Sequence, residues 1–280
     1  MLIRYGYEIT LHCWSPTAVV TLLQIRDGRQ GDHRADEVFE MYPALETRPY
    51  RDLFGNLCRR FMAPAGDVTL TSDAMIEDSG VPETYPVDAE QHAVADLPDE
   101  CLSYLMGSRY CETDRLAPLA WNLFGHVAPG WPRVQAISDF VHQRIRFDYQ
   151  EARATRTAFE AYEERVGVCR DYAHLAVAFF RCMNIPARYV NGYLGDIHVP
   201  LRLPMDFSAW VEVYLGGQWR AIDPRNNMPR IGRIAIAHGR DAADVAMVTS
   251  FGPHVLKNFR VWVEEVQAPD YALMVHAQAG

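Results

Sequence analysis

The chain has 280 residues, of which 49% are hydrophobic, and a formal net charge of −9. This length and composition allow a large core and suit two domains. The acidic balance and the lack of a dense Lys/Arg block exclude the electrostatic footprint of a nucleic-acid or membrane-surface protein. No apolar run is long enough to span a membrane, and the N-terminus lacks the apolar core of a signal peptide. We therefore expect a cytoplasmic protein with no nucleic-acid or membrane partner.

The cysteines are scattered, with no CxxC pair and no regular spacing, at Cys13, Cys58, Cys101, Cys111, Cys169 and Cys182. This pattern fits neither a disulfide framework nor a zinc site. The chain also lacks an HExxH motif, an EF-hand loop and a glycine-rich phosphate loop. We expect no metal and no organic cofactor, and most of the thiols should be small buried apolar groups.

The first hundred residues favour β-structure. Alternating or β-branched runs are separated by Pro, Gly and Asp clusters, and they read YEITLHCW, AVVTLLQI, LCRRFMAP and GDVTLTSDAMIED. Such runs are typical of antiparallel strands. The sequence therefore predicts a β-rich, sandwich-like N-terminal domain over residues 1–105.

From about residue 114 the apolar spacing becomes helical. The helical runs are LAPLAWNLFGHV, WPRVQAISDFVHQRIRF and TAFEAYEERVG, and strand signals return after residue 186 in ARYVNGYL, AWVEVYL, QWRAID, RIGRIAIA and VLKNFRVWVEEV. Helices followed by antiparallel strands predict an α+β second domain over residues 106–280, C-terminal strands included. The Gly- and Pro-bounded segment GDIHVPLRLPMD is predicted to be a surface loop of the kind that covers a site.

A helix is predicted from Cys169 to Asn184, just before a proline. Cys169 lies in its first turn, where free backbone N–H groups favour a thiolate over a thiol. Gly167 is expected to allow a tight turn into the helix, and Arg170 adds a nearby positive charge. Cys182 lies near the other end, where the helix dipole opposes a thiolate. The alternative is that Cys169 only packs.

The segment DFSAWVEVYLGGQWRAIDPRNN is predicted to form two strands joined by Gly216 and Gly217. In that register Trp210 lies opposite Asp223, and Ser208 points to the same face. Ser208 and Asp223 become diagonal neighbours, about 7–8 Å apart at the backbone. An imidazole at position 208 would fill this gap while hydrogen-bonded to the carboxylate. The geometry suits a Cys–His–Asp triad whose middle residue is serine.

These motifs, GVCRDYAHLAVAFFRCMNIPARYVNGY and AWVEVYLGGQWRAIDPRNN, resemble the bacterial transglutaminase-like superfamily, which has a papain-like core. The match spans roughly Ser108 to Pro253, and the β-rich region resembles the domain that precedes this core in many bacterial members. The resemblance implies Cys169 as nucleophile, Asp223 as the residue that orients the base, and Ser208 at the usual histidine position. It also implies attack on a peptide or protein amide through a thioester. Hydrolysis is expected over cross-linking, because water is the abundant acceptor.

Other side chains are candidates for the general base, the oxyanion donor and the wall of the cleft. His198, in the predicted loop, is a possible replacement base, whereas His174 points away from Cys169 around the helix and is predicted to be structural. Tyr110 is a candidate hydrogen-bond donor to an oxyanion, beside the backbone N–H of Cys169. Trp210 is expected to be a core aromatic or a wall that dries the substrate cleft.

Two classes of function stay open. A thiol supplies some thiolate without a base, so a cysteine peptidase, amidase or acyltransferase is the leading hypothesis. The alternative is a catalytically silent peptide-binding module, and the serine at position 208 favours it. A third interpretation makes Cys169 and Asp223 both structural. The sequence carries no signal for a particular substrate or oligomeric state.

Overall fold

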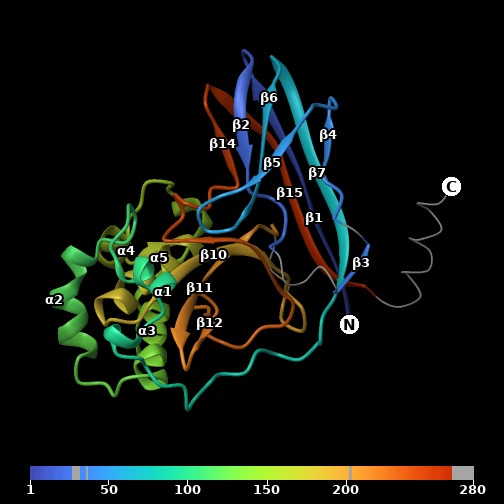
Figure 1. Cartoon of the computed structure of the whole chain (residues 1–280). Coiled ribbons are helices and arrows are strands. Elements are labelled where there is room, and N and C mark those ends of the chain that lie inside the picture. Colours follow the sequence, from blue (N-terminus) through green and yellow to red (C-terminus); the bar gives the residue numbers. More distant parts are fainter. Residues whose placement is uncertain (27–31, 36, 202–203, 267–280) are drawn as a thin grey trace.

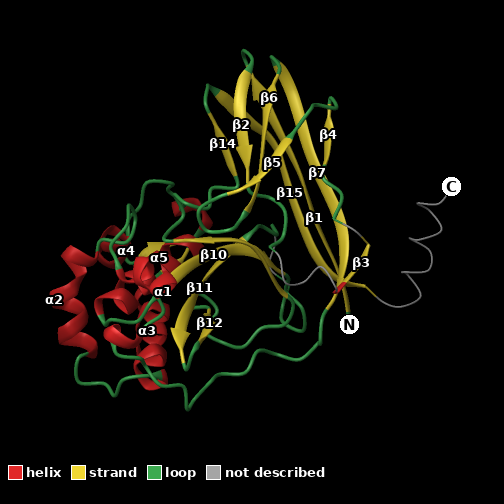
Figure 2. Ribbon diagram, in the orientation of Figure 1, coloured by secondary structure: helices red, strands yellow, loops and turns green. Residues whose placement is uncertain are grey.

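The computed structural model describes residues 1–26, 32–35, 37–201 and 204–266. Two long antiparallel sheets stand on one side of the molecule, and the helices lie beside a third sheet on the other (Figure 1). Figure 2 shows that the helices gather almost entirely in the second part. This arrangement confirms the predicted α+β fold class.

The two long sheets form what we call the β-rich region. In the first sheet the strand order is β15-β1-β7-β3 with β4 also paired to β7, and in the second it is β14-β2-β6-β5. The first sheet consists of β1 (Leu2–Cys13), β3 (His33–Ala35), β4 (Glu40–Tyr42), β7 (Gly66–Glu77) and β15 (His254–Val266). The second consists of β2 (Thr17–Thr21), β5 (Arg48–Arg51), β6 (Leu57–Ala63) and β14 (Val248–Ser250).

The last two strands do not pair as the sequence analysis expected. The sequence predicts that the C-terminal strands belong to the second domain, but β15 pairs with β1 along its whole length and β14 pairs with β2. The apolar alternation in β15 fits any antiparallel edge, and β1 would otherwise present unpaired backbone groups. The β-rich region thus takes strands from both ends of the chain, while the division at residue 105 stays a prediction.

The helical part, which we call the core unit, follows the predicted order. Its helices are α1 (Asp99–Leu102), α2 (Thr113–Phe124), α3 (Trp131–Arg144), α4 (Ala158–Glu164) and α5 (Cys169–Cys182). Its sheet has the order β12-β11-β10-β13, with β10 (Ala187–Leu194), β11 (Ser208–Leu215), β12 (Gln218–Ile222) and β13 (Arg233–Gly239). A short parallel pair joins β8 (Arg146–Phe147) to β9 (Val166–Gly167).

The predicted hairpin register is confirmed. Strands β11 and β12 pair from Leu215↔Gln218 to Val211↔Ile222. The two connecting residues, Gly216 and Gly217, have φ values of 58° and 77°, which only glycine adopts without strain. One step further in the same register lies the pair predicted from the sequence, at positions 210 and 223.

Helix α5 is the centre of the core unit. It contacts α2, α3 and α4 as well as strands β10 and β11. Nearly every residue after its first turn is buried, as expected for a helix surrounded by other elements. The helix therefore holds its first residue, Cys169, at a fixed position beside the start of β11.

Aromatic and amide contacts join the two parts. The ring of Tyr193 on β10 lies 4.9 Å from that of Tyr5 on β1, and Phe207 also contacts Tyr193 at 5.1 Å. Asn56 donates to the carbonyl of His238 at 2.8 Å and accepts from its N–H at 3.0 Å. The core unit is thus seated on the β-rich region through buried side chains.

Candidate active site

The start of α5 is fixed by a buried carboxylate. Asp171 accepts a hydrogen bond from the N–H of Val168 at 2.9 Å and pairs with Arg156 at 3.1 Å. A Cβ on Gly167 would lie 2.6 Å from the Asp171 carboxylate. The glycine is therefore needed for the close approach of the Asp171 side chain.

Cys169 differs from the other cysteines among the described residues, because it is half-buried and the remaining five are buried. Burial raises the pKa of the Cys169 thiol to about 11, although the charge of Arg225 and a hydrogen bond from the N–H of Ala209 lower it. Asp206 and Asp223 raise it further. At pH 7 about one such thiol in 10⁴ is ionised. The expected stabilisation of the thiolate by the helix start is outweighed by desolvation.

Asp223 is fully engaged with neighbours that the sequence analysis missed. One carboxylate oxygen accepts from the side chain of Asn226 at 2.8 Å and lies 3.3 Å from an Arg233 nitrogen, and the other accepts from the Asn226 N–H at 3.0 Å. Ser208 is 6% exposed, and its hydroxyl has no hydrogen-bond partner in the described part of the chain. The register brings Ser208 and Asp223 to one face, but no hydrogen bond joins them.

Arg233 links this face to the segment that precedes the core unit. Its guanidinium lies 4.8 Å from the centre of the Trp210 ring. The Nε atom of the same group pairs with the carboxylate of Glu83 at 2.8 Å. Burial disfavours the cation, but the carboxylates of Asp223 and Glu83 outweigh it and raise the pKa of Arg233. A Cβ on Gly192 would lie 2.7 Å from the Trp210 ring, so the tryptophan needs a glycine on the next strand. Trp210 is thus a buried neighbour of the ion pair; its role as a cleft wall stays a prediction.

The cation that acts on Cys169 is Arg225, whereas the sequence analysis expected Arg170. The Arg225 guanidinium lies over the ring of Phe147 at 4.2 Å. Arg170 instead donates to the carbonyls of residues 153 and 154. The predicted register, continued two positions beyond the Trp210–Asp223 pair, places Arg225 opposite Ser208, so this neighbour could have been found from the sequence. Asp206 lies in the loop before β11, where no periodicity marked it.

Neither candidate histidine is hydrogen-bonded to Cys169 within the described residues. His198 is mostly exposed and lies 3.4 Å from the carboxylate of Glu265 on β15. His174 is fully buried and accepts from the N–H of Ala242 at 3.1 Å. Burial lowers the pKa of His174 well below its usual value, which keeps the ring neutral.

The ring of Tyr110 packs against the ring of His174. Its ring stacks on His174 with a centroid distance of 5.1 Å, and the Arg170 guanidinium lies 4.3 Å from its ring centre. Its backbone N–H donates to Asp241 at 2.8 Å. Among the described residues no hydrogen bond joins the Tyr110 hydroxyl to Cys169, so the oxyanion role stays a prediction.

Comparison with known proteins identifies the class. Residues 122–224 match the family model described as the transglutaminase-like superfamily. A solved structure from Cytophaga hutchinsonii, described as a "Putative Cysteine Protease", is 30% identical with a TM-score of 0.81 and covers 96% of this chain and 91% of its own. The chain therefore belongs to the transglutaminase-like superfamily, as the motifs indicated.

Proteins described as uncharacterized in two mycobacteria are also similar. The one from Mycobacterium leprae is 28% identical over 74% of this chain and 76% of its own length. The one from Mycobacterium tuberculosis is 29% identical over 70% and 68%. The similarity to these relatives spans more than two thirds of each chain.

The described residues contain neither a membrane-spanning helix nor a cluster of metal ligands. None of their helices combines the length and the apolar character needed to cross a membrane. In the same ranges, no group of three or more His, Cys, Asp and Glu side chains is arranged to hold a metal ion.

Proposed function

We propose that this protein is a cysteine-dependent hydrolase of amide bonds in peptides or proteins, acting through a thioester on Cys169. The position of Cys169 carries the proposal: it is half-buried at the start of a helix, with a backbone N–H and the cation of Arg225 acting on its sulfur. A thiol needed only for packing would be buried like the other five.

The reaction takes place in two steps. The Cys169 thiol loses its proton to solvent, and the sulfur attacks the amide carbonyl carbon. The C–N bond then breaks, the leaving amine takes a proton from water, and a thioester remains. Water adds to the thioester, releases the carboxylic acid and restores the thiol. The backbone N–H of Cys169, free at the helix start, is the proposed donor to the oxyanion.

Because Ser208 replaces the base and Asp223 is held by Arg233, solvent must accept the thiol proton in this proposal. The rate should therefore rise about tenfold per pH unit up to about pH 11, the pKa of Cys169. Water is preferred over an amine as acyl acceptor because of its abundance.

A second candidate is a catalytically silent peptide-binding module. The full engagement of Asp223 by Asn226 and Arg233 favours it, because these partners take the place of an imidazole. In this alternative the ion pair keeps the cleft in shape, and Cys169 has no chemical role.

Acetylation by p-nitrophenyl acetate, followed by peptide mass spectrometry, separates the two candidates. We expect acetyl transfer to Cys169 to increase about tenfold per pH unit between about pH 7 and 10. Casein cleavage should follow the same profile and disappear in Cys169→Ala. Cys182, buried in the same helix, is the internal control for unspecific acetylation.

The opposite result would support the binding module. Cys169 would then be acetylated no faster than Cys182 at any pH, while wild type and Cys169→Ala retain casein-derived peptides equally. Acetylation of Cys169 without casein cleavage would support the assignment of Cys169 as nucleophile and contradict the assignment of proteins as substrates.

A further inference from the structure

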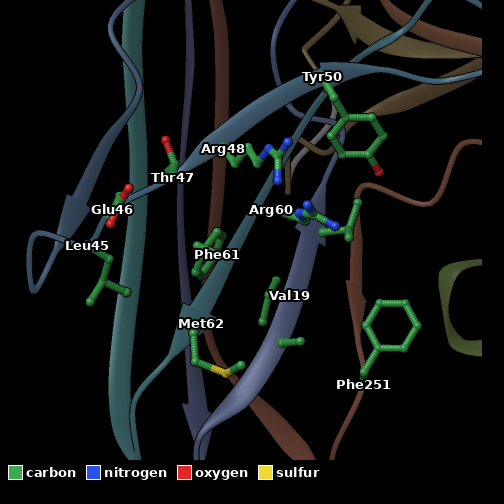
Figure 3. A pocket seen from close by; sticks show the side chains of 12 residues that line it. Val19, Leu45, Glu46, Thr47, Arg48, Tyr50, Arg60, Phe61, Met62 and Phe251 are labelled. Atoms are coloured by element: carbon green, nitrogen blue, oxygen red, sulfur yellow. The ribbon is translucent and has the colours of Figure 1, made fainter.

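The outer face of the second sheet in the β-rich region is hollowed (Figure 3). The hollow has a volume of about 920 Å³ and is lined by side chains from β2, β5 and β6, the segment before β5, and Phe251 just after β14. This volume lies at the upper end of the range for ligand sites. All of the lining residues belong to the β-rich region and its connections, so the hollow is distinct from the site around Cys169.

Apolar side chains cover most of the hollow. Met62 is 57% exposed and Phe251 is 70% exposed, and Ala18, Val20 and Leu45 lie beside them. Large apolar groups that gather on a surface and are rimmed by polar residues typically mark an interaction site. These side chains would gain burial only if another molecule covered them.

Two neighbouring arginines give the hollow its positive charge. Arg48 on β5 and Arg60 on β6 are direct neighbours in the strand register, so their side chains point to the same face. Like charges directly opposite each other destabilise a sheet. Neither arginine has an ion pair or a hydrogen bond in the described part of the chain, although Glu46 lines the same hollow. In Figure 3 both arginines lie toward Tyr50, and Glu46 lies with Leu45 on another side.

An anionic group with apolar flanks complements this surface. We propose that the hollow binds an extended protein segment in which a Glu or Asp side chain, flanked by apolar side chains, is held by Arg48 and Arg60. The carboxylate would separate the two like charges, and the flanking side chains would cover Met62 and Phe251. Binding at the hollow would be independent of the chemistry at Cys169.

The openness of the walls favours a peptide over a long alkyl chain. Met62 and Phe251 are more than half exposed, so an alkyl chain would keep much of its surface in water. β5 is the edge strand of its sheet, but it contains Pro49, which has no N–H to donate. The segment is therefore bound across the face by its side chains, and not as an added strand.

The test uses fluorescent nonapeptide pools with degenerate apolar residues on both sides of a central Glu, Gln or Lys, measured by anisotropy with the full chain. We expect the Glu pool to bind at least about tenfold more tightly than the Gln pool, because charge-assisted hydrogen bonds are lost in the latter. Binding should weaken with salt. It should also be lost in Arg48→Met/Arg60→Met and in Met62→Asp. Arg51→Met is the matched control, since Arg51 is exposed on the same strand but does not line the hollow.

Thermal unfolding of each variant checks that it folds, and the salt dependence tests the wild type without any substitution. Equal binding of the three pools would overturn the proposal, as would binding that survives in Met62→Asp or in the double arginine variant. Saturable binding of decanoate with no preference among the pools would assign the hollow to an amphipathic small molecule instead.

Discussion

The two faces of strand β11 are built in different ways. On one face Ala209, Val211, Val213 and Leu215 are buried apolar side chains, and helix α5 packs on this strand. The other face carries Ser208 and Trp210. The Arg233 guanidinium lies over the Trp210 ring and pairs with Asp223. The first face is stabilised by many similar contacts, whereas the second depends on a few specific ones.

This difference indicates which face of β11 tolerates substitutions. An apolar face loses stability in proportion to the atoms removed. An ion-pair network fails as a unit, because removing one member leaves the others buried and uncompensated. The ion-pair network around Asp223 therefore belongs to the less tolerant face.

The largest effect is expected for Arg233→Met. This change leaves the buried carboxylate of Asp223 and its neighbour Glu83 without their shared cation. The free energy of unfolding should fall by about 3–5 kcal/mol in urea denaturation at neutral pH. Adding Asp223→Asn and Glu83→Gln removes the unpaired charges and should restore much of the loss. A loss below about 1 kcal/mol in Arg233→Met would show that the two faces do not differ as argued.

Substitutions on the apolar face should lower the free energy of unfolding according to the number of atoms removed. Leu215→Ala creates a cavity in a fully buried position and should cost about 2–5 kcal/mol. Tyr214→Phe, on the opposite face of the same strand, changes only a hydroxyl and should cost less than about 1 kcal/mol. Both values come from the same urea titration. Similar losses in the two variants would contradict the assignment of the faces.

Much of the apolar face could be predicted from the sequence, because its signals are local. The helical spacing after Cys169 predicted α5, and two adjacent glycines predicted the hairpin register. The network around Asp223 could not be predicted in this way, since Glu83 and Arg233 lie 150 positions apart in the chain. The pairing of β15 with β1 is non-local for the same reason.

The ionisation of Cys169 could not be predicted from the sequence either. Its position in the first helical turn was predicted correctly, but the pKa of the thiol depends on what covers it. Desolvation is set by tertiary packing, and no local pattern reports it.

The polar face should also make the protein sensitive to acid. His238 lies in line with Trp210 across the sheet through Val190, and burial lowers its pKa to about 2. The unfolded chain binds a proton below about pH 6.5 and the native chain does not, so stability falls as the pH is lowered through this range. We expect a loss of about 2 kcal/mol at pH 5 from this residue.

His238→Gln tests this expectation. Thermal unfolding between about pH 5 and 7 should depend less on pH in this variant than in the wild type. His126→Gln, at an exposed position, is the control and should keep the wild-type slope. An unchanged slope in His238→Gln would mean that the ring is protonated in the native state.

A smaller effect is expected when the usual base is restored. In Ser208→His the imidazole would lie on the same face as Asp223, and its cationic form would stabilise the Cys169 thiolate. The pH midpoint of Cys169 alkylation by iodoacetamide should fall by about one unit or more, a tenfold faster reaction at pH 7. Ser208→Gln is the matched neutral control. A midpoint that stays near the wild-type value in Ser208→His would show that Arg233 and Asn226 keep Asp223 from the new imidazole.

The smallest effect is expected for Ser208→Ala. The Ser208 hydroxyl is buried without a partner among the described residues, so its removal should change the free energy of unfolding by less than about 1 kcal/mol. The alkylation midpoint of Cys169 should stay unchanged, because a serine does not shuttle protons at neutral pH. A larger loss of stability would mean that the hydroxyl is hydrogen-bonded in solution. If the midpoint rose as well, Ser208 would act on the thiol, and the polar face would contain chemistry that depends on serine and not only on Arg225.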